Sequence, residues 1–376
     1  MNKRILYLMH IPWGWIKQRP HFLAEALSTD FHIDILCKSP WKVRKSSLIN
    51  KNENDLHIKS FIQFPFDKIS LLRNVSLLNI INKIFLRFSI SKKKFNSYDY
   101  IWITSISIYP MISHLINDKS VIIWDCMDDE LEFGPIKNNI FLLDKYRELE
   151  STLIKRADII FCSSEYLSKK IQRRTEVSRD IKIVNNAIQL PTIEGETNNV
   201  DLQTLNNLEY ISEFPNIFMY IGAISEWFNF DILINVLDKE PNMYIVLIGP
   251  NDVPIKKHER IIHLGVVNRR WIFHFMEKST ALIMPFKINE LIRSVNPVKI
   301  YEYIYANRPV IAPYYEEIEK FSNYIHTYNS QDDFLLITKK IIAGELSTLK
   351  SEMDNKEFAY NNQWKNRYIE IKKVIS

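Results

Sequence analysis

The 376-residue sequence predicts an α/β protein with two doubly wound, mostly parallel sheets, and three observations favour this fold class. Short apolar runs alternate with longer helical patterns along most of the chain. The alternation stops once, in the polar, turn-rich stretch 192–216, and then resumes, which is typical of a linker between domains. Glycine occurs only seven times, yet Gly14, Gly222, Gly249 and Gly265 each lie just after an apolar run, where a strand turns toward the next helix.

These patterns predict two Rossmann-like domains that face each other across a cleft, at residues 1–195 and 196–357. We expect strands at 4–9, 31–37, 100–104, 120–124, 159–163, 181–185, 216–221, 243–248, 260–264, 280–286 and 308–313. We expect helices at 19–28, 140–157, 230–240, 269–279 and 297–306. A final helical segment at about 358–376 is expected to cross back and pack on the first domain.

Composition and charge narrow the function classes. The formal net charge of +5 suits an anionic small molecule or an acidic membrane surface, but is too weak to indicate nucleic acid. Cys37, Cys126 and Cys162 are scattered in apolar runs without metal-ligand spacing, as expected of reduced cysteines in a cytoplasmic protein. The N-terminal apolar run is too short for a signal peptide, and no stretch approaches the ~20 apolar residues that span a bilayer.

The segment MPFKINELIRSVNPVKIYEYIYANRPVI, residues 284–311, predicts one short helix with a charged loop at its start. Asn296 is a suitable N-cap and Pro297 a suitable first helical residue, while Asn307 before Arg308-Pro309 predicts the end of the helix.

The start of that helix predicts an anion site. Ser294 and Val295 precede it, so backbone N–H groups and the helix dipole are available, and Arg293 and Lys299 add positive charge. Lys299 and Glu302 lie three residues apart on one helix face, where the carboxylate can accept hydrogen bonds from ribose hydroxyls. The alternative is a surface salt bridge beside an ordinary capped helix.

The same segment resembles the donor-binding region of GT-B glycosyltransferases of the "glycosyl transferases group 1" type. Further pieces match in order: HIPWGWIKQRPHFLAEAL, WDCMDDE, IIFCSSEYLSKKI, IVNNAI, IGAISEWFNFDILI, VLIGPN and HLGVV. The resemblance spans nearly the whole chain. It implies an acceptor-side N-terminal domain and a C-terminal domain that holds a nucleotide diphosphate-sugar.

Carried over by position, the resemblance places Glu302 on the donor ribose. In this family a glutamate usually contacts the donor sugar, but Ser294 stands at its position here. The family also has an Arg and a Lys that neutralise the diphosphate, but their positions fall near Ala223 and Phe228, so this basic pair is missing. Arg293, Lys299 and the helix start are therefore expected to meet the phosphates. The full set of expected donor-binding residues is Gly14, Gly222, Ser225, Glu226, Val266, Arg293, Ser294, Val295, Asn296, Lys299 and Glu302.

Three carboxylates, Asp125, Asp128 and Asp129, follow the strand at 120–124. Asp125 or Asp128 is expected to act as the general base that deprotonates the acceptor, which gives inversion at the sugar carbon. Three alternatives stay open: a divalent-metal site of the Asp-x-Asp kind, a turn that caps the next helix, and a retaining, front-side reaction.

Residues around Gly14 are expected on the acceptor side. Trp13 and Trp15 offer aromatic surface for a sugar face, and Arg19 and His21 lie at the next helix start. The alternatives are core tryptophans and an exposed helix-start histidine.

The expected function is glycosyl transfer from a nucleotide diphosphate-sugar, with a UDP-sugar favoured, to a saccharide or polyprenyl-linked acceptor in bacterial surface polysaccharide synthesis. No cofactor and no metal are expected. Residues 75–95 combine apolar residues with basic ones and predict peripheral contact with an anionic membrane at its inner face. The alternatives are a non-catalytic sugar-binding or scaffold protein of the same shape and a sugar-nucleotide epimerase; a nicotinamide dehydrogenase is disfavoured because no G-x-G-x-x-G follows any strand.

Overall fold

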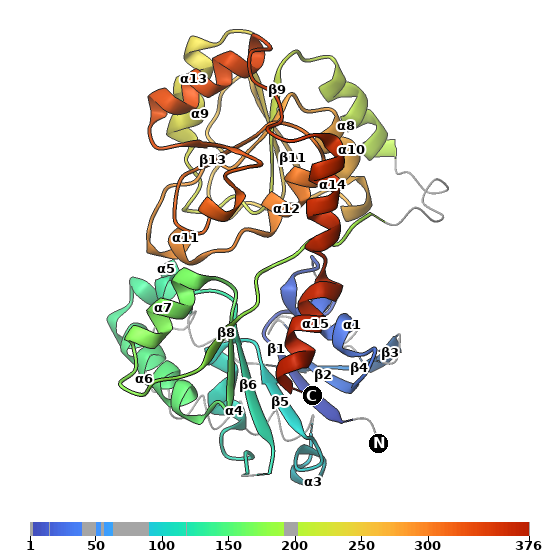
Figure 1. Ribbon diagram of the computed structural model, residues 1–376, viewed down its shortest axis with the longest axis vertical. Helices are drawn as coiled ribbons and strands as arrows, with labels where there is room; N and C mark the ends of the chain where they lie inside the picture. Colours follow the sequence, from blue (N-terminus) through green and yellow to red (C-terminus); the bar gives the residue numbers. More distant parts are fainter. Residues whose placement is uncertain are drawn as a thin grey trace. The chain divides into compact units, whose positions relative to one another are not determined.

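The computed structural model describes residues 3–14, 16–39, 50–53, 56–62, 90–117, 119–191 and 202–375. The chain divides into two compact units (Figure 1): unit 1 comprises Met1–Asn186 and Arg367–Ser376, and unit 2 comprises Ala187–Asn366. The first change of unit therefore falls at Asn186–Ala187, before the expected position at 195. The C-terminal residues return to unit 1.

Unit 1 is built on an eight-stranded sheet of order β3-β4-β2-β1-β5-β6-β7-β8. Its strands are β1 Arg4–Met9, β2 His32–Ser39, β3 Asn50–Glu53, β4 Leu56–Ile62, β5 Tyr100–Ile103, β6 Val121–Cys126, β7 Ile159–Cys162 and β8 Ile181–Ile183. All pairs are parallel except β3 with β4, two strands that the sequence analysis missed. The winding direction reverses between β1 and β5, and ligands of such sheets bind at this switch point.

The helices of unit 1 lie between its strands in the chain (Figure 1). They are α1 Arg19–Leu27, α3 Lys92–Phe95, α4 Tyr109–Ile112, α5 Gly134–Lys137, α6 Ile140–Arg156 and α7 Glu165–Arg173, with 3-10 turns η2 Ile106–Ile108 and η3 Glu130–Glu132. The last helix, α15 Trp364–Ile375, is tied to unit 1 through Tyr368 and Lys372, which both bond the Asp30 carboxylate.

Unit 2 has a fully parallel six-stranded sheet of order β11-β10-β9-β12-β13-β14. The strands are β9 Ile217–Ile221, β10 Tyr244–Ile248, β11 Ile261–Gly265, β12 Ala281–Ile283, β13 Val310–Pro313 and β14 His326–Tyr328. Side chains of β9 alternate between two cores: Met219 packs on one face of the sheet and Phe218 and Tyr220 on the other. The switch point lies between β9 and β12.

The helices of unit 2 correct two expectations. They are α8 Leu202–Ser212, α9 Phe230–Lys239, α10 Ile272–Glu277, α11 Glu290–Ser294, α12 Val298–Tyr305, α13 Gln331–Ile342 and α14 Glu352–Asn361, with 3-10 turns η5 Arg269–Trp271 and η6 Glu319–Phe321. The stretch 192–216 contains α8, so its described part is helical rather than an irregular linker. The final helical segment is divided into α14 and α15.

The segment 284–311 forms two helices where one was expected. Asn289 caps α11, since its Oδ1 accepts a hydrogen bond from Ile292 N at 2.9 Å. Pro297, rather than Asn296, is the N-cap of α12, because Asn296 is 1% exposed and its Oδ1 accepts from Tyr301 Oη instead. Asn307, with φ of 54°, follows the end of α12 as predicted.

The three cysteines are buried free thiols, as expected. No helix among the described residues is long and apolar enough to span a bilayer. Of the predicted membrane-contact segment 75–95, residues 75–89 lie outside the described residues.

Candidate active site

A histidine lies at the switch point of unit 1. His10 directly follows β1, and its Nδ1 is 2.8 Å from Thr104 Oγ1, just beyond β5. Burial, with smaller contributions from Lys38 and His21, lowers the pKa of His10 to about 4, so the imidazole is neutral at neutral pH. His10 was not among the expected site residues, although its place directly after the first strand was a signal in the sequence.

Asp125 is held in a buried ion pair. The Arg19 Nη2 and Nε atoms donate to Asp125 Oδ1 at 2.7 and 3.1 Å, and the two side chains are 3% and 0% exposed. Arg19 Nη1 also donates to Val184 O at 2.6 Å. A carboxylate paired and buried in this way is not available as a base. The structure therefore corrects the expectations that Asp125 acts as the base and that Arg19 contacts the acceptor.

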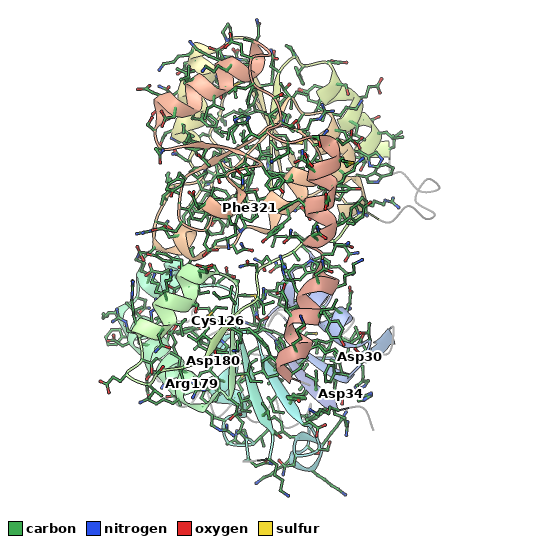
Figure 2. The ribbon with its side chains drawn as sticks, viewed as in Figure 1. Asp30, Asp34, Cys126, Arg179, Asp180 and Phe321 are labelled. Atoms are coloured by element: carbon green, nitrogen blue, oxygen red, sulfur yellow. The ribbon has the colours of Figure 1, made fainter. Side chains whose placement is uncertain are left out.

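Asp128 is the carboxylate that remains accessible. Asp128 is half-buried in the loop after Cys126, which is the last residue of β6 and is labelled in Figure 2. Among the described residues, no hydrogen bond or ion pair engages its carboxylate. Burial raises the pKa of Asp128 to about 6, with Arg19 opposing and Asp129 and Asp125 adding to the rise. A carboxylate of that pKa is suited to accept a proton near neutral pH.

The carboxylates that follow Asp128 are held by ion pairs and hydrogen bonds. Asp129, 1% exposed, accepts from Arg174 at 2.7 and 2.9 Å and from Lys170 at 2.8 Å. Glu130 accepts from Ser105 Oγ at 2.9 Å and from the backbone N–H of Ile106 at 2.8 Å, and burial raises the pKa of Glu130 to about 7.

A divalent-metal site at these carboxylates was one of the alternatives that the sequence left open. Within the described ranges, no group of three or more histidine, cysteine, aspartate or glutamate side chains is arranged to hold a metal ion.

Two of the expected acceptor residues, Trp13 and His21, form a buried pair. Trp13 is 8% exposed and its ring lies 5.2 Å from that of His21, which is 1% exposed. Burial lowers the pKa of His21 to about 4. Of the described residues around Gly14, Trp13 therefore offers no open aromatic face and His21 is not an exposed helix-start histidine. Gly14 has a φ of 90°, which fits the predicted tight turn, and Trp15 lies outside the described residues.

Two glycines bring the loops after β9 and β10 of unit 2 into contact. A Cβ at Gly249, where φ is 140°, would lie 2.0 Å from the carbonyl oxygen of Gly222. Phe228, at the position where a basic residue was missing, is 2% exposed and packs against Tyr220 and Phe230. The apolar substitution therefore fills the core and contributes no charge.

Three other expected donor residues differ in exposure. Ser225 is buried, and its hydroxyl donates to Asp252 Oδ2 at 2.9 Å, which links the loops after β9 and β10. Glu226 and Val266 are exposed, the latter at 61%.

Glu302 lies in a cluster with two cations. Lys299 Nζ is 2.7 Å from one carboxylate oxygen, as the spacing predicted, and Arg269 Nη2 is 2.7 Å from the other. Burial alone would raise the pKa of Glu302, which is 1% exposed, but Lys299 and Arg269 hold it below its ordinary value. The cluster, named here the Glu302 cluster, carries two positive charges and one negative. Arg269 was not among the expected site residues; its only signal in the sequence was its place four residues after the end of β11.

The remaining residues of the 293–296 stretch are engaged locally. Arg293 pairs with Glu290 at 3.4 Å and with Glu316, so its charge is already matched. Ser294 is fully buried and its hydroxyl donates to Glu290 O at 2.9 Å. Tyr315 Oη contacts Val295 O at 3.4 Å. These contacts argue against direct binding of the donor nucleotide-sugar by Arg293 or by the Ser294 hydroxyl. Of Arg293 and Lys299, the two cations expected to meet its phosphates, Lys299 remains.

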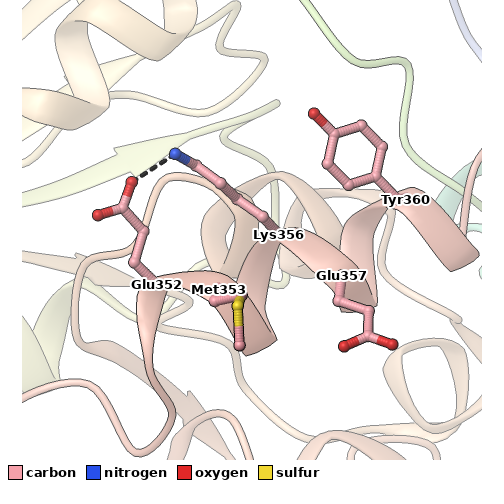
Figure 3. Close-up of a pocket in the computed structure, with 5 residues that line it drawn as sticks. All are labelled: Glu352, Met353, Lys356, Glu357 and Tyr360. Atoms are coloured by element: carbon pink, nitrogen blue, oxygen red, sulfur yellow. Dashed lines mark hydrogen bonds and ion pairs between the residues drawn. The ribbon is translucent and has the colours of Figure 1, made fainter.

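A separate depression of about 600 Å³ lies along α14 and is lined by Glu352, Met353, Lys356, Glu357 and Tyr360. Figure 3 shows these five side chains. All of these residues come from one helix, and Lys356 pairs with Glu352. None of the expected site residues lies in it.

Comparison with solved structures identifies the class of fold. The chain is similar to sucrose-phosphate synthase from Thermosynechococcus elongatus, with a TM-score of 0.74, 11% identity, and coverage of 99% of this chain and 98% of the other. It is also similar to HepE of Anabaena in complex with UDP and glucose, with a TM-score of 0.68, 11% identity and the same coverage. The predicted GT-B fold class is confirmed.

The sequence of the chain is also similar to that of a curated protein. "Putative teichuronic acid biosynthesis glycosyltransferase TuaH" of Bacillus subtilis (strain 168) is 26% identical over 282 residues, which cover 70% of this chain and 69% of the relative. No protein-family model matches the chain. The expected class is confirmed: the chain is a glycosyltransferase of the GT-B type.

Proposed function

We propose that this glycosyltransferase moves a sugar from a UDP-sugar to a hydroxyl of a saccharide or lipid-linked saccharide in bacterial surface polysaccharide synthesis, without a metal ion. The observation that carries the proposal is the Glu302 cluster on α12, the second helix after β12, which is one of the two strands at the switch point of unit 2. Its excess of positive charge suits a diphosphate, and a carboxylate oxygen that accepts one hydrogen bond retains a lone pair for a ribose hydroxyl. HepE has been solved with UDP and with UDP-glucose, which supports uracil as the base of the donor nucleotide.

In the proposed reaction, Asp128 takes the proton of the acceptor hydroxyl. The acceptor oxygen forms a bond to the anomeric carbon as the bond from that carbon to the diphosphate oxygen breaks. The electron pair leaves with the diphosphate, and Arg269, Lys299 and the N–H groups at the start of α12 stabilise the negative charge. Attack assisted by a separate base gives inversion at the anomeric carbon.

Two variants test this assignment. UDP release is measured with a panel of UDP-sugars and extracted lipid-linked saccharides, with and without EDTA. Asp128→Asn should bind UDP normally and lose turnover, whereas Glu302→Gln should lose UDP affinity. Full turnover in Asp128→Asn would remove the base assignment. Conversion of the donor to another sugar nucleotide, without transfer of the sugar, would favour an epimerase. Nucleotide binding without transfer or conversion would favour a non-catalytic scaffold protein.

We also propose peripheral contact with an anionic membrane through residues 75–95, of which Ile90–Phe95 are described. Lys92, Lys93 and Lys94, the first three residues of α3 Lys92–Phe95, are exposed. Flotation with vesicles containing anionic phospholipid should retain the protein at low salt and release it at high salt, because the attraction is screened. Absence from the vesicle fraction at low salt would reject the contact.

A further inference from the structure

The loop after β6 leaves one carboxylate open and restrains those around it. Asp125 is paired with Arg19, Asp129 with Arg174 and Lys170, and Glu130 with Ser105 and the N–H of Ile106. Asp128 lies between these anchored positions.

Arg174 connects this loop to two helices. It caps the C-terminus of α7, and its two terminal nitrogens meet the two oxygens of Asp129 at 2.9 and 2.7 Å, a two-point geometry that fixes the orientation of the carboxylate. The same Nη1 donates to Glu150 Oε1 on α6 at 2.9 Å. One guanidinium thus links the loop after β6 to both α6 and α7.

The charges around Asp128 make this contact relevant to its proton affinity. Arg19 from α1, Asp125 from β6, and Asp129 and Glu130 from its own loop act on Asp128. Behind Asp129 lie Arg174 and Lys170 of α7 and Glu150 of α6. Without Arg174, two buried carboxylates would lose their main counter-charge, and Asp129 would repel the ionised form of Asp128 more strongly.

We propose that Arg174 is a positioning residue for Asp128. By binding both carboxylate oxygens of Asp129, Arg174 fixes the Asp128–Asp129 peptide and offsets the negative charge of Asp129. This inference rests on the proposed role of Asp128 as the base. Arg174 itself touches neither substrate. Its effect on catalysis passes through Asp129 and the backbone.

The test is the titration of Asp128, which needs no substrate. It is measured as the pH dependence of the stability difference between each protein and the same protein carrying Asp128→Asn. Arg174→Met should move the midpoint to higher pH by about one unit, the effect of one uncompensated charge a few ångströms away at an intermediate dielectric. Asp129→Asn should move it to lower pH, because it removes the like charge and leaves Arg174 in place.

Opposite shifts in these two variants would support the proposal, and Asp129→Asn still provides a test if Arg174→Met does not fold. Unchanged midpoints in the variants that fold would overturn it. Arg174→Lys separates charge from geometry: it keeps the charge but not the two-point contact, so kcat should fall about tenfold with little midpoint shift and an unchanged donor KM. If Asp128→Asn were fully active, the base assignment itself would fail. If Asp128→Asn is inactive but Arg174→Lys keeps the wild-type kcat, only the positioning role fails.

Discussion

Replacing Asp128 by asparagine should stabilise the protein while it removes turnover. Burial raises the pKa of Asp128 from 3.8 to about 6 in the folded protein. A carboxyl whose pKa is higher in the folded than in the unfolded state binds its proton more tightly when folded. The wild type therefore loses stability as pH rises from about 4 through 6. The shift of about two units corresponds to about 3 kcal/mol at 1.36 kcal/mol per unit.

Urea unfolding of the wild type and of Asp128→Asn, at half-unit steps from pH 4 to pH 8, measures this effect. The two free energies of unfolding should be similar near pH 4, and the variant should be more stable by up to about 3 kcal/mol at pH 7. Asp144→Asn, which changes an exposed carboxylate on α6, should stay within about 0.5 kcal/mol of the wild type. If the free energies of unfolding of the wild type and Asp128→Asn change with pH in parallel, the reasoning is refuted, because the pKa of Asp128 would then be the same in the folded and unfolded states.

Other predictions concern the fold. Asp125→Asn leaves the buried Arg19 guanidinium without its counter-charge and should lower the free energy of unfolding by about 3–5 kcal/mol; a loss below 1 kcal/mol in urea unfolding would show that the pair is not structural. Gly249→Ala should destabilise unit 2 and weaken nucleotide binding, because its methyl group meets the Gly222 carbonyl; unchanged Tm and UDP affinity would contradict the close loop approach. Ser330→Ala removes the N-cap of α13 and should cost about 1 kcal/mol in the same unfolding assay; no change would mean that α13 does not depend on this cap.

Much of the fold could be predicted because buried parallel strands appear as continuous apolar runs. The run at 217–221 and its partners on either side were identifiable in this way, whereas β3, with the sequence NKNE, has no apolar signature. The helix α8 was missed for a related reason. Only Thr204 and Ile211 of α8 are buried, so its sequence lacks the wide apolar stripe of a core helix.

The site was partly predictable, and the errors share one cause. The spacing of Lys299 and Glu302 identified a contact within one helix, which the structure contains. Contacts between distant segments leave no such spacing: Arg269 meets Glu302 from 33 residues away, and Arg19 meets Asp125 from 106. Sequence could therefore propose Asp125 and Asp128 as alternatives but could not show that a distant arginine occupies the first.

The most direct test of nucleotide-sugar use is a thermal-stability titration of the purified protein with UDP, GDP, CDP and ADP, with and without magnesium. One diphosphate, expected to be UDP, should raise the Tm without magnesium, since ligand at 100 times its Kd adds about 2.7 kcal/mol to the folded state. Glu302→Gln should weaken that binding by about 1–3 kcal/mol, whereas Glu316→Gln, an exposed carboxylate beside Arg293, should not change it. No shift with any of the four nucleotides in the folded wild type would contradict a donor site in unit 2 and leave a GT-B protein without nucleotide-sugar chemistry.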